Sequence, residues 1–253
     1  MPEALPTSPD DERLRGWYHT IELGDGLVSR GIYDHRPIVD CYGLPKSLRG
    51  KTALDVGTWD GFWAFELERR GADRVVAVDI PSFEDFDWLP WIRESLGALR
   101  ATRPHFDLAH AMRRSRVEHQ SCSVYDLSPE QVGTFDVVFC GSLLLHLQNP
   151  LRALVNIRSV TNELAIIETL LDPELDPYDR PWLAFGHREV EARLGEAAVY
   201  WKFSTRALRE MMEYAGFSST QPLAPFSLPP AGPQVVSVIG YPASTASLGV
   251  PST

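Results

Sequence analysis

The stretch ALDVGTWDGFWAFELERRGADRVVAVDI, residues 53–80, has the pattern of a strand, a glycine turn, a helix and a second strand. Asp55, Gly57 and Gly61 form a tight cluster in it, and a second acid, Asp79, lies near its end. Glycines between a strand and a helix let the backbone approach a ligand closely. This unit therefore predicts a ligand site at the turn.

Strand-like and helix-like segments alternate along the rest of the chain, which is the signature of a parallel α/β sheet. We predict strands at residues 52–56, 74–80, 116–127 (with its exit loop), 135–141, 163–171 and 234–241. We predict helices at residues 62–71, 106–115, 149–160 and 204–217, with Asp60, Asn149 and Ser204 as N-caps and Gly71 and Gly216 at two C-terminal ends.

Several segments lie outside this alternation. Residues 1–12 and 242–253 are predicted to be disordered ends, and residues 13–50 precede the first strand. Two long connections, 81–115 and 172–203, interrupt the domain predicted over residues 51–241. Long connections in compact domains often form lids and binding loops.

Composition limits the classes of function. The chain has 253 residues and a formal net charge of −10, which disfavours non-specific attraction to nucleic acid or an anionic membrane. Its three cysteines form no C-x-x-C pair, so we expect reduced thiols and no metal site. The first residues lack the pattern of a signal peptide, and no apolar run approaches the roughly 18 residues of a membrane span. We therefore expect a cytoplasmic protein.

The turn at residues 57–61 discriminates between two classes of ligand. A dinucleotide-binding turn carries G-x-G-x-x-G, and here the first G-x-G is missing. Trp59 would crowd a pyrophosphate, and Asp60 would place negative charge where a helix N-terminus receives an anion. The sequence therefore predicts a ligand without a diphosphate at this turn.

The pattern Asp-x-Gly-x-x-x-Gly resembles motif I of the class I S-adenosylmethionine methyltransferases. By this resemblance Asp79 takes the ribose hydroxyls and Asp126 reads the adenine amino group. The stretch FDVVFCGSLLLHL, residues 135–147, resembles the fourth-strand motif beside the methionine part of the cofactor. Asp55 would organise the ammonium group of that part, directly or through water.

The resemblance implies a Rossmann-like class I methyltransferase fold. Its mostly parallel, seven-stranded sheet would carry helices on both faces, with N-terminal and internal lid segments added. The cofactor would be S-adenosylmethionine and the product S-adenosylhomocysteine. The cofactor-binding residues implied are Asp55, Gly57, Thr58, Trp59, Gly61, Asp79, Ile80, Tyr125, Asp126, Gly141, Ser142 and Trp17.

Two stretches, WYHTIELGDGLVSRGIYDHRP (residues 17–37) and GSLLLHLQNPLRAL (residues 141–154), are similar to the tRNA wobble-uridine methyltransferases of the 5-oxyacetic acid pathway. The similarity spans roughly residues 16–217. In that branch the leading segment folds over the cofactor pocket, so Trp17, Tyr18 and His19 are candidates to cover the sulfonium or the acceptor. Packing aromatics are the alternative for Trp17 and Tyr18. The tRNA enzymes use a carboxylated cofactor and carry a further N-terminal region, so that cofactor and the tRNA acceptor stay open for this sequence.

Methyl transfer is an in-line displacement that needs alignment, exclusion of water and, for some acceptors, a general base. Histidine is the natural base near neutral pH. His146 follows the predicted fourth strand and is the first candidate, with orientation of the helix at Asn149 as its alternative role. His19 is the second candidate and His187 the third. Glu168 is a possible acceptor-side group, or a cap.

The acceptor is predicted to be a small aromatic or mostly apolar molecule that is methylated on oxygen or nitrogen. Candidate substrate contacts are Tyr18, Arg36, Trp182 and Trp201, and Phe185 and Tyr200 could extend an apolar wall. Three alternatives compete with this function. The first is a tRNA-modifying enzyme with a basic groove of Arg113, Arg114 and Arg116. The second is a cofactor-binding regulatory domain, and the last is a nicotinamide oxidoreductase.

Overall fold

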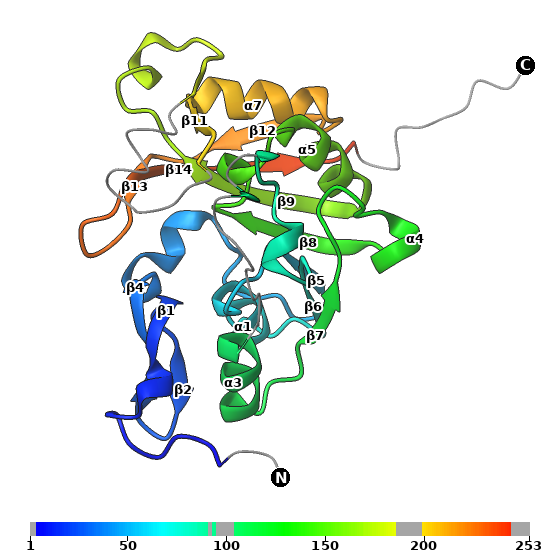
Figure 1. The fold of residues 1–253 in the computed structure, drawn as a ribbon. Coiled ribbons are helices and arrows are strands. Elements are labelled where there is room, and N and C mark those ends of the chain that lie inside the picture. Colours follow the sequence, from blue (N-terminus) through cyan, green and yellow to red (C-terminus); the bar gives the residue numbers. More distant parts are fainter. Residues whose placement is uncertain (1–3, 91–92, 95–103, 186–198, 244–253) are drawn as a thin grey trace, which may run out of the picture.

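The computed structural model describes residues 4–90, 93–94, 104–185 and 199–243. Its main sheet has the strand order β12-β14-β9-β8-β5-β6-β7, and β13 pairs with β14 at the side of this path (Figure 1). These strands are β5 (Thr52–Val56), β6 (Arg74–Asp79), β7 (Glu118–Ser121), β8 (Phe135–Gly141), β9 (Thr161–Leu170), β12 (Ser219–Pro222), β13 (Phe226–Ser227) and β14 (Gln234–Tyr241).

The five strands from β7 to β9 run parallel, whereas β14 is antiparallel to β9, β12 and β13. The prediction of a mostly parallel α/β sheet of seven strands is therefore confirmed, with the short strand β13 as an addition beside β14. The strand of this sheet that comes first in the sequence, β5, lies between β6 and β8, so successive strands are added on one side of it and then on the other. In open α/β sheets, ligands bind outside the carboxyl ends of the strands at such a point.

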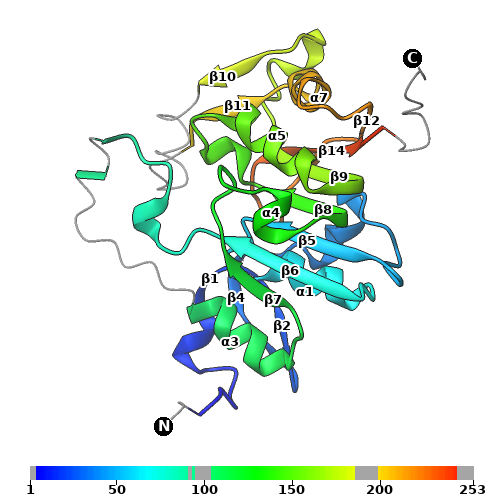
Figure 2. The same ribbon diagram turned by 90° about the vertical axis from the view of Figure 1, so that its right-hand side faces the viewer.

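Helices cover both faces of the sheet, as Figure 2 shows for α5 and α7 on one face and α1 on the other. The helices are α1 (Phe62–Arg69), α3 (Pro104–Arg113), α4 (Pro129–Val132), α5 (Pro150–Ser159) and α7 (Thr205–Tyr214). Short 3-10 turns are η1 (Glu12–Leu14), η2 (Arg36–Tyr42), η3 (Phe83–Asp85), η4 (Leu144–His146) and η5 (Asp176–Tyr178). Alternate residues of β8 and β9 contribute to two separate buried apolar clusters, one on each face.

Local sequence signals explain several helix boundaries. Asn149 accepts a hydrogen bond from Arg152 N at 3.1 Å, and Ser204 accepts one from Ala207 N at 3.1 Å, so both predicted N-caps are confirmed. The helices α1 and α7 end just before Gly71 and Gly216, which have φ values of 87° and 103°.

The prediction that Asp60 caps α1 is wrong, because Gly61 is the N-cap residue and makes no side-chain cap. The carboxylate of Asp60 instead binds the N-terminal segment, as described below. The strand β12 also escaped the sequence analysis. It has only four residues, all of them polar or proline, so no apolar alternation marks it.

The N-terminal segment forms two small pairs of strands. In the first, β1 (Arg15–His19) is parallel to β4 (Arg30–Tyr33), and in the second β2 (Glu22–Gly24) is antiparallel to β3 (Leu27–Val28). These strands, blue in Figure 1, lie beside α1 and α3. A further antiparallel pair, β10 (Leu183–Phe185) and β11 (Trp201–Phe203), belongs to the predicted insertion 172–203.

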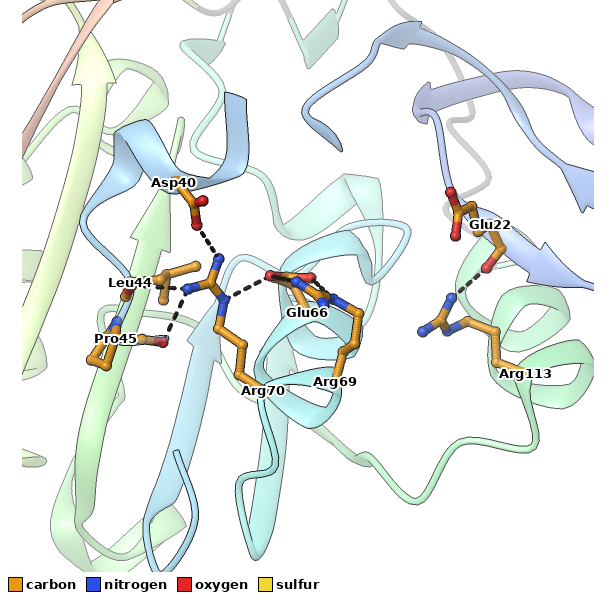
Figure 3. Close-up of polar contacts among 8 residues, drawn as sticks. All are labelled: Glu22, Asp40, Leu44, Pro45, Glu66, Arg69, Arg70 and Arg113. Carbon is orange, nitrogen blue, oxygen red and sulfur yellow. Dashed lines mark hydrogen bonds and ion pairs between the residues drawn. The ribbon is translucent and has the colours of Figure 1, made fainter. Parts of the chain in front are cut away.

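Buried Arg70 joins the N-terminal segment to α1 (Figure 3). Its guanidinium, 4% exposed, donates to Glu66 Oε1 at 2.7 Å and to the carbonyl oxygens of Leu44 and Pro45 at 2.9 and 3.0 Å. It also pairs with exposed Asp40 of η2 at 2.9 Å. A planar guanidinium suits this fan of acceptors, so Arg70 holds η2 against the first helix of the sheet domain.

Parts of the predicted domain organisation lie outside the described residues. These are 1–3 and 244–253 of the two predicted disordered ends, and 91–92, 95–103 and 186–198 of the two predicted insertions. No helix in the described part of the chain is long and apolar enough to cross a membrane.

We predict that Arg70→Ala lowers the free energy of unfolding by about 3 kcal/mol, because the carbonyl groups of Leu44 and Pro45 lose their buried donor and Glu66 keeps only its pair with the more exposed Arg69. Chemical denaturation followed by circular dichroism measures this change. Arg206→Ala is the matched control, since Arg206 makes exposed pairs on α7 and its loss should change stability little. Equal stability of the two variants would contradict the anchoring role of Arg70.

Candidate active site

The carboxyl ends of β5, β6, β7 and β8 lie along one edge of the sheet, because these strands are parallel neighbours. The loops that leave this edge carry most of the predicted cofactor residues. Gly57 and Thr58 follow β5, Ile80 follows β6, Tyr125 and Asp126 follow β7, and Ser142 follows β8. The fold thus brings four separate stretches of sequence to one place.

The glycine turn after β5 is held by the neighbouring strand. The amides of Gly57 and Thr58 donate to Val78 O at 2.9 and 3.1 Å. Gly57 and Gly61 have φ values of 77° and 93°, and a Cβ at Gly61 would lie 2.5 Å from the ring of Phe65. Both positions therefore require glycine for conformation, and Gly61 also requires it for space.

Asp55 lies directly under this turn and is 1% exposed. Its Oδ2 atom has no hydrogen-bond partner among the described residues. Burial raises the pKa of Asp55 to about 7, since desolvation penalises the charged form. A cationic group of a ligand would compensate for this cost, which is what an ammonium beside Asp55 would do.

Asp79, at the end of β6, joins two of the loops. Its Oδ2 accepts from Trp59 N at 2.7 Å, and its Oδ1 accepts from Ile80 N at 2.8 Å. Trp59 has a φ of 51°, and its side chain is 41% exposed at this edge. Asp79 therefore sets the conformation of the turn, and its contact with a ligand stays a prediction.

Asp87, which was not among the predicted site residues, contacts the loops after β7 and β8 and the insertion 172–203. Its carboxylate accepts from Tyr125 Oη at 2.6 Å and from Gln148 N at 2.6 Å. Its carbonyl oxygen accepts from Tyr200 Oη at 2.7 Å. No periodic pattern surrounds Asp87 in the sequence, so only the tertiary structure reveals this role. Asp126, by contrast, is exposed.

His146, the first candidate base, ends η4 in the loop after β8. It is half-buried, and its ring lies 5.6 Å from that of Phe86. The insertion packs against the same loop, since Tyr200 N donates to Leu145 O at 2.8 Å and Trp201 Nε1 donates to Leu147 O at 2.9 Å. Trp201 is thus placed near His146, while a catalytic role for His146 stays a prediction.

The second candidate base, His19, is engaged by Asp60. Its Nδ1 is hydrogen-bonded to Asp60 Oδ1, and Asp60 Oδ2 accepts from the amides of Tyr18 and His19 at 3.1 and 2.8 Å. Both His19 and Asp60 are buried. This contact fastens β1 to the start of α1, which is an anchoring arrangement, and the catalytic role of His19 stays a prediction.

The other candidates are spread over the N-terminal segment and the insertion. Trp17 is fully buried and stacks on His105 of α3 at 4.6 Å, so its ring exposes no surface to a ligand in this structure. Tyr18 is half-buried against Tyr33, and Arg36 pairs with Asp34 at 2.7 Å. Trp182 is 43% exposed.

The structure therefore brings Trp201 to the loop of His146 and leaves Trp182 at the surface. His187 lies outside the described residues. Within the described residues, no group of three or more His, Cys, Asp or Glu side chains could hold a metal ion.

Comparisons with known proteins agree with this architecture. The methyltransferase domain family matches residues 42–221 of the chain. A tRNA U34 carboxymethyltransferase of Helicobacter pylori (strain G27) is 25% identical over 182 residues, covering 70% of this chain and 60% of the relative. A tRNA U34 carboxymethyltransferase of Psychrobacter cryohalolentis is 28% identical over 182 residues, covering 69% of this chain and 45% of the relative. The chain thus spans less than two thirds of the length of these relatives.

Two solved structures share the fold. The N-terminal domain of EvdMO1, crystallised in the presence of SAH and D-fucose, has a TM-score of 0.59 at 20% identity, covering 90% of this chain and 92% of that one. The 1,6-didemethyltoxoflavin-N1-methyltransferase of Burkholderia thailandensis, with bound 1,6-didemethyltoxoflavin and S-adenosylhomocysteine, has a TM-score of 0.53 at 17% identity, covering 78% of this chain and 72% of that one.

We predict that Asp60→Ala loosens the N-terminal segment and lowers the free energy of unfolding by about 3 kcal/mol, because two buried amides and His19 lose their acceptor. Hydrogen exchange should rise over residues 15–33 more than elsewhere. Asp73→Ala is the control, since its carboxylate accepts a hydrogen bond from the exposed amide of Gly50 at 3.1 Å. Unchanged exchange over residues 15–33 in Asp60→Ala would show that Asp60 is not the anchor.

Proposed function

Because this chain belongs to the methyltransferase domain family, we propose that it transfers a methyl group from S-adenosylmethionine to a small-molecule acceptor. The observation that carries the proposal is Asp55. It is a buried carboxylate with one oxygen lacking a partner among the described residues, directly under a turn that requires glycine. The ammonium of the cofactor's methionyl tail would supply the missing positive charge.

The remaining part of the cofactor fits the other loops of the same edge. Asp79, held between two loops, would receive the ribose hydroxyls, and the stretch around Tyr125 and Asp126 would lie at the adenine. The ends of β5 and β8 would then flank the sulfonium, with Gly57 on one side and Gly141 on the other. The sulfonium would thus lie toward η4 and its His146.

The reaction depends more on alignment of the acceptor with the methyl group than on side chains that form bonds to either. The acceptor's nucleophile attacks the methyl carbon in line with the carbon–sulfur bond, which breaks, and S-adenosylhomocysteine leaves as a neutral thioether. The contacts of Asp87 with Tyr125, Gln148 and Tyr200 hold the loops that would position the acceptor and exclude water.

Three features favour a small molecule over tRNA as the acceptor. The formal net charge is −10. Arg113 of the candidate basic groove donates instead to Glu22 O (Figure 3), and its guanidinium lies 5.2 Å from the ring of Phe65. Burial lowers the pKa of Arg113. The two structural neighbours above were crystallised with D-fucose and with 1,6-didemethyltoxoflavin, which are small molecules. The resemblance to tRNA enzymes keeps tRNA as the second candidate.

Turnover decides between these candidates. The protein would be incubated with methyl-labelled S-adenosylmethionine and either a panel of small alcohols, phenols, amines and carboxylic acids or total tRNA. Label in a small acceptor, insensitive to salt, supports the proposal. Label only in tRNA supports the second candidate, with steep salt dependence expected. Tight binding of the cofactor without transfer to either would support a regulatory domain.

We predict that Asp79→Ala weakens the binding of S-adenosylmethionine by about tenfold to a hundredfold, because hydrogen bonds to a charged group are lost. Isothermal titration calorimetry measures the dissociation constant. Asp179→Ala is the matched control, since that acid is exposed and pairs with Arg206 away from the strand ends. Wild-type affinity in Asp79→Ala would place the cofactor elsewhere.

We predict that affinity for S-adenosylhomocysteine rises with pH and levels off above about 7. The ammonium binds the ionised form of Asp55, whose pKa is about 7, so each pH unit below this value costs up to about tenfold in affinity. Titrations between pH 5.5 and 8.5 measure the profile. Asp55→Asn should bind more weakly and remove the dependence, and an unchanged profile in this variant would contradict the assignment.

A further inference from the structure

A second buried carboxylate, Glu168 of β9, lies at the same edge and has no role in the mechanism above. It is 1% exposed. In the sheet it pairs with Gly141 of β8 on one side and with Ser237 of β14 on the other. It lies two residues beyond Ile166, the partner of Phe139, which in turn pairs with Asp55. Side chains two apart on a strand share a face, so Glu168 and Asp55 point to the same side of the sheet.

The position of the carboxylate over β8 follows from its contacts. Ser142 Oγ lies 3.0 Å from Glu168 Oε2 and 3.4 Å from Oε1, and Ser142 N donates to Glu168 O at 3.1 Å. A Cβ at Gly141 would lie 3.3 Å from Glu168 Oε2. The carboxylate therefore lies over the backbone of Gly141, at the end of β8 where the cofactor's sulfur is proposed to lie.

Within the described part of the chain, the groups close to Glu168 bring it hydrogen bonds from Ser142 but no positive charge. Burial and the charge of Glu168 raise the pKa of Tyr42 of η2, on the same side of the sheet, and of Cys140 of β8, whose thiol lies on the opposite face. Tyr42 Oη is hydrogen-bonded to His35 Nδ1 at 2.7 Å, and burial lowers the pKa of His35 to about 2, so this imidazole is neutral. Among the described residues, no Lys, Arg or His side chain forms an ion pair with Glu168. Burial raises the pKa of Glu168 to about 7.

We propose that Glu168 faces the sulfonium of the bound cofactor and accepts the proton of the acceptor, which is therefore an alcohol, phenol or amine. The inference rests on the proposed function and assigns its proton-accepting group and its acceptor class. An unpaired buried carboxylate is costly, and a ligand cation beside it reduces that cost. Because the carboxylate lies over Gly141, the sulfonium of the bound cofactor would lie beside it and supply that positive charge.

The step balances with these groups alone. For an alcohol or phenol, the O–H proton passes to the Glu168 carboxylate as an oxygen electron pair forms the bond to the methyl carbon. For an amine, the nitrogen lone pair forms that bond, and an N–H proton of the resulting ammonium passes to Glu168. In both cases the electrons of the carbon–sulfur bond go to sulfur. An acceptor carboxylate would bring no proton and would meet a like charge. The same charge opposes a carboxylated transferred group, so the unmodified cofactor fits this site better.

Proton release on cofactor binding tests the location of Glu168 without any acceptor. The sulfonium lowers the pKa of a neighbouring carboxylate, whereas the neutral sulfur of S-adenosylhomocysteine does not. At pH 7, wild-type protein should release about 0.3 to 0.5 more protons with S-adenosylmethionine than with S-adenosylhomocysteine, as a group with pKa near 7 is half protonated there. Calorimetry in two buffers of different ionisation enthalpy measures the difference.

Variants show which carboxylate releases the additional proton. Glu168→Gln should bind S-adenosylhomocysteine within about threefold of wild type and abolish the difference between the two ligands. Asp55→Asn should keep the difference, because both ligands carry the same ammonium. Glu163→Gln is the matched control on the same strand, with an exposed carboxylate paired with Lys51. Equal proton release for the two ligands in wild type, or a difference that persists in Glu168→Gln, would overturn the inference while leaving cofactor binding intact.

The rate of transfer tests the proton-accepting role on any acceptor found in the panel. Glu168→Gln should lower kcat about a hundredfold or more, with the KM for the cofactor nearly unchanged, and remove the rise of kcat with pH. The variant His146→Asn tests the other candidate base in the same assay. Wild-type kcat and pH profile in Glu168→Gln, or a panel in which only carboxylates are methylated, would show that Glu168 does not accept the proton. Failure of both cofactor forms to bind would instead overturn the proposed function.

Discussion

The contact of Asp60 with β1 is the interaction on which the candidate site depends. It supplies acceptors for the amides of Tyr18 and His19 and for the His19 ring, at the point where the glycine turn enters α1. The N-terminal segment is thereby held over the sheet face that carries Asp55 and Glu168. Arg70 makes the second attachment, through η2. Without these two attachments, water would reach both carboxylates and their pKa values would fall toward ordinary values.

The two buried carboxylates show how the fold prepares a site for a cation. Burial raises the pKa of Asp55 and of Glu168 to about 7, so each is poorly compensated by the protein itself. A ligand with an ammonium and a sulfonium would offer one positive charge to each. The two buried carboxylates would lower the stability of the protein without its ligand, and binding of the ligand would compensate for this loss. The acidic edge is thus consistent with a cationic cofactor and a neutral acceptor.

Local rules predicted the elements and failed where a tertiary contact competed with them. Asn149 and Ser204 cap their helices as their local sequence predicts, and the Ser204 hydroxyl keeps this role although it also accepts from Trp182 N and donates to Arg180 O. Asp60 has the composition of a cap and is used instead by a segment more than 40 residues earlier in the chain. Trp17 follows the same logic: its place against His105 depends on α3, which no pattern around residue 17 reveals. Asp87 lacked any signal at all.

The sequence by itself determined the parallel α/β sheet, the glycine turn and the acids at the ends of its strands, because these follow from short-range periodicity and backbone conformation. It also determined the family, since Asp55, Gly57, Gly61 and Asp79 stand in one ordered stretch. Only the tertiary structure decided which side chains are consumed by the fold and which face an uncompensated charge. His19 is bound by Asp60, and Glu168 lies buried over Gly141. Burial and pairing arise between distant segments, so the electrostatics of the site are a property of the folded chain.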